Sequence, residues 1–314
     1  MDLRRSLPTI GLVALLLLDL GLVVWALWPA GTTAASPSPS AGRPSTSVSS
    51  SASPSPSASA SAEPPAAARP LSRVVSAASA QVVWAAGTGS CDEPGKVHVS
   101  RDGGKTWRSQ DAPGAVTRIR PNDGRSGFVI GGDDQCRLRL WNTSDAGASW
   151  TDPRSAADAW GRDPDDATRV HRPGGDPVKP CQADARVLDL AGLRDGVASV
   201  VCNDGTVRTT SDAGARWTTS LEREGLVALA LTAPGRGAVA IVAEDCTGVA
   251  VAALAGGKVG TVQCLEDVAP RPGQVSVSVV ADATWLVAGD TVLRAPSADA
   301  STGTFAKVGS WPKG

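Results

Sequence analysis

Hydrophobic and polar positions follow three different patterns along this chain of 314 residues. An apolar run, interrupted by Asp19 alone among charged residues, occupies residues 10–28, behind a short polar start at residues 1–9. Residues 29–70 carry almost no large apolar side chain, whereas residues 71–314 show short apolar runs separated by Gly, Asp and Asn. These changes divide the chain into an N-terminal tail, a hydrophobic span, a linker and one β-rich domain.

The apolar run at residues 10–28 has the length of a transmembrane helix. As a helix it would span about 28 Å, close to the ~30 Å hydrocarbon core of a bilayer. It is longer than the apolar region of a cleavable signal peptide, about 7–15 residues, and Trp25 and Trp28 would lie at the membrane interface. Because Arg4 and Arg5 precede it, we expect a signal-anchor with its N-terminus in the cytoplasm and the β-rich domain outside. Secretion after cleavage near Ala34 is the alternative.

Ser, Pro and Ala dominate residues 29–70. A segment of this composition cannot bury a hydrophobic core, so we predict a disordered stalk. Fully extended at ~3.1 Å per residue it would reach at most ~130 Å, and as a flexible coil it would average about 35 Å. The stalk would hold the following domain away from the membrane.

Short β-rich runs recur in sets of four along residues 71–314. One position in the second run of each set recurs at intervals of 46, 71, 41 and 46 residues. These anchors are Val83, Val129, Val200, Ile241 and Val287. A four-stranded repeat of about 40–45 residues is the period of a propeller blade. We therefore predict an all-β fold, a β-propeller of four-stranded antiparallel blades.

The 71-residue interval contains a surplus of about 25 residues beyond one normal repeat. This surplus, Ser155–Cys181, forms either a degenerate, shortened blade or an insertion between blades. A degenerate blade gives six blades in total, which is the count we predict. Five and seven blades remain as alternatives.

One eight-residue pattern, S/T-x-D-x-G-x-x-W, occurs three times in this domain. A short Asp side chain accepts hydrogen bonds from N–H groups just ahead of it, and Ser or Thr does the same. The Gly suits a positive φ angle, and the Trp buries a large ring as the next strand begins. The pattern therefore predicts hairpin turns closed by their own side chains. Its defining residues are Ser100, Asp102, Gly104 and Trp107, then Thr143, Asp145, Gly147 and Trp150, then Thr210, Asp212, Gly214 and Trp217.

The three copies resemble the Asp-box, or BNR repeat, of sialidase-like β-propellers. This resemblance implies that the twelve residues are structural and lie away from any active site. Sialidases use a Tyr nucleophile, and this chain contains no Tyr. The family's Phe/Tyr-Arg-Ile-Pro motif precedes the first Asp-box, whereas the nearest match here, Thr117–Pro121, follows it. The resemblance therefore supplies the repeats but no catalytic residue.

A glycoside hydrolase that uses two carboxylates does not need Tyr. It requires two carboxyl groups about 5–9.5 Å apart, one of them with a raised pKa. The acids available in loops are Asp133, Asp134, Asp163, Asp165 and Asp166. Nothing in the pattern places two of them across a cleft, so we interpret them as solvated loop acids.

Charge and histidine content narrow the range of ligands. The 30 Lys and Arg residues nearly balance 31 Asp and Glu, which argues against a nucleic-acid partner. His98 and His171 are the two histidines of the chain and form no ligand cluster, so we predict no metal and no cofactor.

All six cysteines lie in the β-rich domain, as expected for disulfides in an oxidising compartment. Six cysteines allow 15 pairings. Two of the cysteines follow equivalent second strands of adjacent blades, and the others lie near one another in order. We therefore predict the pairs Cys91–Cys136, Cys181–Cys202 and Cys246–Cys264.

A β-rich domain on a stalk and a membrane anchor, without a catalytic motif, favours a binding role. We expect a non-enzymatic module that binds or assembles a protein or a glycan of the cell envelope. Similar tandem blades occur in photosystem assembly factors, although a shared fold is weak evidence of function. The alternative is a carbohydrate-active hydrolase. A cleft with paired carboxylates would favour the hydrolase, and a face with apolar or Arg patches would favour binding.

Overall fold

The computed structural model of the protein describes residues 69–194 and 196–312. The predicted transmembrane span, residues 10–28, and nearly all of the predicted stalk lie outside the described residues. Within the described part of the chain, no helix is both long and apolar enough to traverse a lipid bilayer.

The described residues form six antiparallel sheets, each built from strands that are consecutive in the chain. Blade 1 contains β1 (Arg73–Ala77), β2 (Val83–Gly89), β3 (Pro94–Ser100) and β4 (Arg108–Asp111). Blade 2 contains β5 (Ala115–Pro121), β6 (Gly127–Gly132), β7 (Leu138–Thr143) and β8 (Arg154–Ser155). Blade 3 contains β9 (Gly161–Arg162), β10 (Val170–Arg172) and β11 (Gly175–Val178). Blade 4 contains β12 (Val187–Gly192), β13 (Ala198–Cys202), β14 (Thr206–Thr210) and β15 (Thr218–Glu222). Blade 5 contains β16 (Leu226–Ala233), β17 (Arg236–Ile241), β18 (Val249–Ala255) and β19 (Lys258–Leu265). Blade 6 contains β20 (Val275–Val280), β21 (Ala283–Ala288), β22 (Thr291–Ala295) and β23 (Ala306–Ser310).

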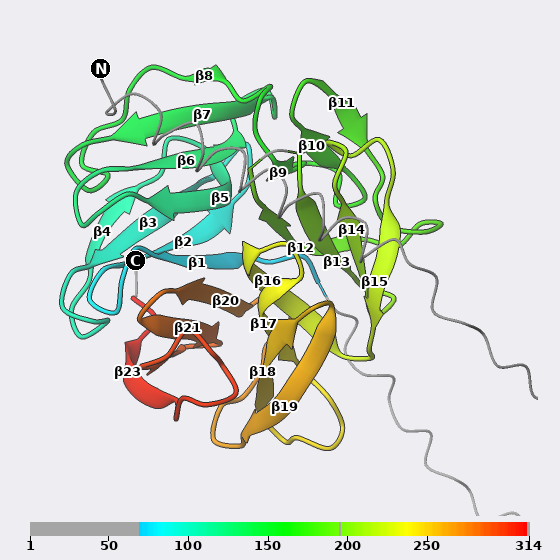
Figure 1. The fold of residues 1–314 in the computed structure, drawn as a ribbon. Coiled ribbons are helices and arrows are strands. Elements are labelled where there is room, and N and C mark those ends of the chain that lie inside the picture. The colour runs from blue at the N-terminus through cyan, green and yellow to red at the C-terminus, as the bar shows by residue number, and fades with distance from the viewer. Residues whose placement is uncertain (1–68, 195, 313–314) are drawn as a thin grey trace, which may run out of the picture. The chain divides into compact units, whose positions relative to one another are not determined.

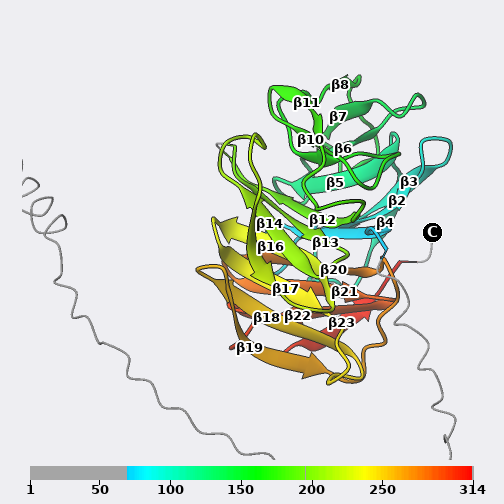
Figure 2. The ribbon, with the colours of Figure 1, turned by 90° about the vertical axis from the view of Figure 1, so that its right-hand side faces the viewer.

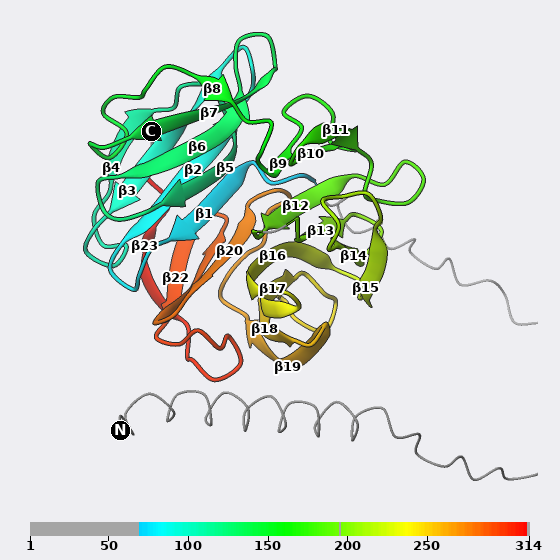
Figure 3. The ribbon, with the colours of Figure 1, turned by 45° about the horizontal axis from the view of Figure 1, so that its top comes forward.

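The six sheets follow one another around a central axis in chain order, as the colour sequence in Figure 1, Figure 2 and Figure 3 shows. The prediction of a six-bladed propeller with antiparallel blades is confirmed. Five blades have four strands each, and blade 3 has three. Blade 3 lies within Ser155–Cys181, so the surplus segment is a shortened blade and not an insertion.

Valine and small residues let neighbouring blades pack face to face. In β20 the sequence Val-Ser-Val-Ser places Val275 and Val277 in the core shared with blade 5, because alternate residues of a strand point to opposite sides. The buried faces of blade 5 use Ala238 and Ala240 at the same interface. Such small side chains allow the sheets to approach closely, since interiors are packed without voids.

Tryptophans fill the larger gaps between blades. Trp84, Trp160 and Trp285 are each at most 2% exposed. A Cβ atom added to Gly127 of blade 2 would lie 3.0 Å from the ring of Trp84, so glycine makes room for the indole of the preceding blade. Burying one indole removes roughly 150–250 Å² from water, which stabilises the fold by about 4–6 kcal/mol.

Blade 6 meets blade 1 at a seam where no sheet contains strands from both ends of the chain. Side chains bridge this seam instead. The backbone N–H groups of Val75 and Ala77 in β1 donate to the hydroxyl oxygens of Ser276 and Ser278 in β20, over 3.1 and 3.0 Å. Arg73 forms an ion pair with the carboxylate of Asp290 over 3.1 Å. The ring is therefore closed by side-chain hydrogen bonds, by packing, and by backbone bonds from Ser72 and Arg73 to the Gly273 carbonyl just before β20.

Candidate functional site

The propeller has two faces that differ in chemistry. The inner strands β1, β5, β12, β16 and β20 begin at one face and end at the other. All six cysteines lie close to the starts of inner strands, in loops after second strands or at neighbouring strand ends. We call this the disulfide face. The turns between third and fourth strands, which carry the repeated motif in blades 1, 2 and 4, lie at the opposite end, which we call the Asp-turn face.

The first motif forms a turn whose polar atoms bond to one another. The Asp102 carboxylate accepts hydrogen bonds from the N–H groups of Lys105 and Thr106, over 3.1 and 3.0 Å, and from both nearby hydroxyls. The N–H of Gly104 donates to the hydroxyl oxygen of Ser100 over 2.9 Å. The indole N–H of Trp107 donates to the Gly104 carbonyl over 3.1 Å. These bonds satisfy turn groups that have no strand partner.

The second and third copies repeat this arrangement. Asp145 accepts from the N–H of Ser149, and Asp212 accepts from the N–H of Arg216, over 2.9 Å in each case. Gly147 and Gly214 donate to the hydroxyls of Thr143 and Thr210 over 3.0 Å. The Trp residues differ, because the N–H of Trp150 reaches the Asp111 carbonyl of blade 1 over 3.2 Å whereas that of Trp217 is buried without a partner in the described structure.

Hydrogen bonds within these turns stabilise the ionised carboxylates. Bonds from the Thr106 hydroxyl and N–H lower the pKa of Asp102 to about 2, and the Ser149 hydroxyl and N–H lower the pKa of Asp145 to about 2. These acids are anionic at neutral pH, and their oxygens are already engaged within the turns. Proton transfer requires a group with a pKa near the working pH.

The disulfide face carries three disulfides, so the disulfide bonds expected from the cysteine count are confirmed. The bond between Cys91 and Cys136 joins blade 1 to blade 2. A second bond connects the segment after β11 to β13, and a third lies within blade 5. These bonds are Cys181–Cys202 and Cys246–Cys264. Four blades and the shortened blade are thus constrained at this one face.

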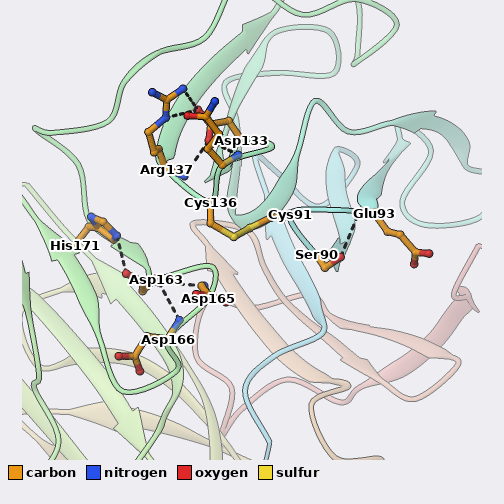
Figure 4. Close-up of a disulfide and its surroundings, with 11 residues drawn as sticks. Ser90, Cys91, Glu93, Asp133, Cys136, Arg137, Asp163, Asp165, Asp166 and His171 are labelled. Atoms are coloured by element: carbon orange, nitrogen blue, oxygen red, sulfur yellow. Dashed lines mark hydrogen bonds and ion pairs between the residues drawn. A yellow bond between two sulfur atoms is a disulfide. The ribbon is translucent and has the colours of Figure 1, made fainter.

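The predicted loop acids of blades 2 and 3 lie on the disulfide face, near Cys91 and Cys136 (Figure 4). Asp133 pairs with Arg139 over 2.9 Å and with Arg137 over 3.0 Å. Burial tends to raise the pKa of Asp133, but these arginines and two backbone N–H groups outweigh burial and lower it. Asp134 is exposed.

Asp163 and Asp165 both line a cavity on the disulfide face. Asp163 accepts a hydrogen bond from the imidazole of His171 over 3.0 Å. Burial tends to raise the pKa of Asp163, but the bond from His171 and the N–H groups of Asp165 and Asp166 lower it overall. Asp166 pairs with Arg169 over 3.2 Å. These acids are stabilised as anions, whereas a glycosidase general acid needs a raised pKa.

His98 lies in β3, where it is buried beside the seam. Its Nδ1 atom is 2.8 Å from the Ser109 hydroxyl, and its ring packs edge-on against Trp311. Burial, followed by the charges of Lys96 and Arg73, lowers the pKa of His98 to about 4. The ring is therefore neutral at physiological pH and belongs to the packing of the seam.

Blade 3 lacks an inner strand. Its innermost strand, β9, begins next to Trp160 and ends next to Asp163. Trp160 packs beside Gly192 at the end of β12, whereas Asp163 lies on the disulfide face. This direction is opposite to that of the inner strands and matches that of second strands such as β2. The position next to β12 that an inner strand would occupy is therefore open for other groups.

Two arginines and the start of the domain fill this position. The Arg118 guanidinium, from β5, donates to the carbonyls of Trp160 and Gly192 over 3.3 and 2.9 Å. Leu71 donates its N–H to the Leu188 carbonyl of β12 over 3.0 Å, and its own carbonyl accepts from Arg162 over 3.0 Å. Carbonyl groups of blade 3 and of the free edge of β12 are thus satisfied by side chains and by the chain entering the propeller.

Asp189 partly balances the charge of Arg162. Its carboxylate accepts from the N–H of Leu190 over 2.8 Å and from the N–H of Leu229 in the next blade over 2.9 Å. Burial raises the pKa of Asp189. Burial and then the nearby Arg120 lower the pKa of Arg118 to about 10, which leaves it cationic at neutral pH.

Two cavities lie along the central axis, and Leu71 contributes to the lining of both. The disulfide-face cavity has a volume of ≈ 280 Å³ and includes Thr88, Thr117 and Asp163. The channel cavity has a volume of ≈ 350 Å³ and extends toward the Asp-turn face between the ends of all five inner strands. It combines Arg118 and Arg120 on β5 with both apolar and hydroxyl-bearing residues from the other strands, a combination that can hold and orient a ligand.

Sequence reasoning missed the charged residues of the channel. Arg118 and Arg120 were noticed only as part of a misplaced sialidase-like motif, and Asp189 and Arg162 were not singled out. The available signal was charge inside apolar inner-strand runs, as in Val187–Gly192, where Asp189 interrupts Val, Leu and Ala. A charge there must be hydrogen-bonded or paired once the strand is buried.

No protein-family model matches the chain, and no curated protein matches its sequence. Similar solved structures include YCF48 bound to a D1 peptide, with 17% identity, coverage of 78% of this chain and 87% of that chain, and a TM-score of 0.39. A fungal lectin from Aleuria aurantia with a six-bladed β-propeller fold has 10% identity, coverage of 79% and 98%, and a TM-score of 0.48.

The GH74 xyloglucanase from Xanthomonas campestris is also similar, with 17% identity, coverage of 75% of this chain but 38% of that chain, and a TM-score of 0.28. At such low identities and TM-scores, these similarities carry no information about the ligand or the site. The propeller architecture rests on the strand pairing of this chain itself.

Proposed function

We propose that this protein is a membrane-anchored, extracytoplasmic β-propeller that binds a protein or a glycan of the cell envelope without catalysing a reaction. The observation that carries this proposal is the channel cavity. It combines two arginines with a lining of apolar and hydroxyl-bearing residues at the Asp-turn face. Polar groups placed in a concave site fix the orientation of a ligand, and the apolar residues add contact area.

The acids of the disulfide face support a binding role over hydrolysis. Asp133 and Asp163 are each bonded to cationic or N–H groups of their own neighbourhood, and the pKa of each is lowered. A glycoside hydrolase instead needs one carboxyl group that remains protonated near neutral pH.

The location outside the cytoplasm rests on the apolar run at residues 10–28 and on three disulfides, which persist in oxidising compartments. We further propose that the three motif turns are Asp-boxes with a structural role. The bonds within each turn support this role, because they use the carboxylate oxygens that a ligand would need.

Site-specific photocrosslinking of the full-length protein in its membrane tests the proposal. A photoreactive amino acid at Thr232, which is exposed and lines the channel cavity, should capture a partner. The matched control carries it at Thr219, which is exposed on β15 at the rim. A glycan array with the same protein covers carbohydrate ligands. Equal capture at both positions, with no glycan bound, contradicts the proposed site, and turnover of a glycoside by the purified protein contradicts the non-enzymatic role.

A further inference from the structure

We propose that the channel cavity binds a carboxylate attached to a small apolar body, with Arg118 and Arg120 as the groups that hold the anion. This inference rests on the proposed binding function and names the chemical class of the ligand. It follows from the placement of the two guanidinium groups, from the way the one acid in the cavity is used, and from the walls opposite the arginines.

Arg118 is held in place with hydrogen-bond donors to spare. Its guanidinium group donates one hydrogen bond to the carbonyl of Trp160 and one to the carbonyl of Gly192. A guanidinium group has five N–H donors, in a rigid planar fork that suits carboxylates. Two donated bonds leave three donors, and because the two carbonyls fix the fork, little conformational entropy is lost when an anion binds.

Arg120 adds a second positive charge to the same cavity. It lies two residues further along β5, so it points to the same side of the strand as Arg118. Arg120 is exposed, and within residues 69–194 and 196–312 no ion pair forms at either arginine. Two neighbouring guanidinium groups repel each other, and a bound anion would relieve this repulsion.

The acid that lines the channel cavity does not neutralise these arginines. Both carboxylate oxygens of Asp189 accept backbone N–H groups, one from Leu190 and one from Leu229 of the next blade. Asp189 thus stabilises the contact between blades 4 and 5. The cavity keeps an excess of positive charge at its β5 wall, which favours an anionic ligand.

The remaining walls favour an apolar body of limited size. Half-buried apolar residues from β12, β16 and β20 border the cavity while packing against the blade cores, including Leu190, Leu231 and Val279. A volume of ≈ 350 Å³ is near the lower end of the range for ligand pockets, about 300–1,000 Å³. The ligand part that enters is therefore small, such as a short branched acid or the last residue of a peptide that ends in a free carboxylate.

Calorimetric titration of the full-length protein with matched acids and amides tests this inference. The probes are isocaproate and isocaproamide, and N-acetyl-alanyl-leucine and its C-terminal amide. Each acid should bind about tenfold or more tightly than its amide, because bonds to a charged group are the stronger ones. Binding of isocaproate points to a free small acid, and binding of the dipeptide acid alone points to a peptide terminus.

Variants connect the preference to the two arginines. Arg120→Gln should weaken acid binding about tenfold and leave the amide unchanged, and Arg118→Lys should weaken it as well because the planar fork is lost. Arg125→Gln is the control, since Arg125 is exposed on the β5–β6 turn and does not line the cavity. Arg120 donates no bond within the described structure, so its replacement leaves the fold intact even if Arg118→Lys does not fold.

Equal binding of acid and amide, no binding of either, or unchanged acid affinity in Arg120→Gln would overturn the inference. The proposed function fails differently. If crosslinking at Thr232 captures a partner while the acids do not bind, the binding role stands and the carboxylate assignment falls.

Discussion

Replacing Gly104 by Ala tests whether the motif glycine serves both the turn and the packing between blades. Gly104 has a φ angle of +87°, and an added Cβ would lie 3.0 Å from Val308 and 3.1 Å from the ring of Trp285. Both neighbours belong to blade 6, so the substitution strains the turn and presses on the seam. The matched control is Gly256→Ala, because Gly256 has a φ of +59° and no heavy atom within 4 Å of the added Cβ.

The two substitutions share one energetic contribution and differ in another. Placing a Cβ at positive φ destabilises the folded state by about 1–2 kcal/mol, and both variants should lose this amount. Overpacking a buried site adds about 1–3 kcal/mol, and only Gly104→Ala should lose this further amount. The difference corresponds to roughly 2–12 °C in melting temperature for a domain of this size.

Guanidinium unfolding of the full-length protein, followed by tryptophan fluorescence, measures both variants under one condition. We expect Gly104→Ala to unfold at a clearly lower denaturant concentration than Gly256→Ala, with the same slope for both. Equal destabilisation of the two variants would refute the packing argument and leave only the backbone contribution. A stability equal to wild type would refute the φ argument as well.

Three further predictions concern stability. Ser276→Ala removes the hydrogen-bond acceptor of the buried Val75 N–H, so it should lower the free energy of unfolding by about 1–3 kcal/mol, measured in urea. An unchanged free energy of unfolding would show that the hydroxyl does not support the seam. Replacing both cysteines of a disulfide by Ala should lower the free energy of unfolding by about 4 kcal/mol for Cys91–Cys136 and by about 3 kcal/mol for Cys246–Cys264, measured by guanidinium unfolding. The loss is larger for the first pair because its cysteines are 45 residues apart, whereas those of the second pair are 18 apart. The reverse order would contradict the loop-entropy account. The folded-state pKa of His98, about 4, lies below its ordinary value of 6.5, so the unfolded state binds the proton first. Stability should therefore be complete above about pH 6.5 and fall by up to about 3 kcal/mol as the pH drops toward about 4. Urea midpoints measured across this window should vary less in His98→Gln, and an unchanged dependence would exclude His98 as the source.

The blade architecture was accessible from the sequence because its signals are local. Strand runs and turn residues such as Asp102 and Gly104 act within a few positions, so their spacing revealed five blades and the surplus segment. The fourth strand of blade 5, β19, is not evident from the sequence pattern. Its sequence, Lys258–Leu265, mixes Gly, Thr and Gln with Val, which dilutes the apolar pattern on which strand prediction depends.

The channel could not be predicted in the same way, because it is assembled from distant segments. The loss of the inner strand of blade 3 matters only because Leu71, Arg118 and Arg162 converge on the vacated position. Sequence spacing gives no indication that these three residues meet. The same holds for Asp189, whose partner Leu229 lies 40 residues away on the next blade.

The path of the chain into the propeller has a mechanical consequence. Leu71 and Ser72 are hydrogen-bonded to Leu188 of β12 and to Gly273 just before β20, next to the axis and not at an outer edge. A pulling force transmitted through the preceding chain would be shared at once between blades 4 and 6 and would act on the hub. Forced extension should therefore meet its first resistance at these two central bonds, before any outer strand is peeled away.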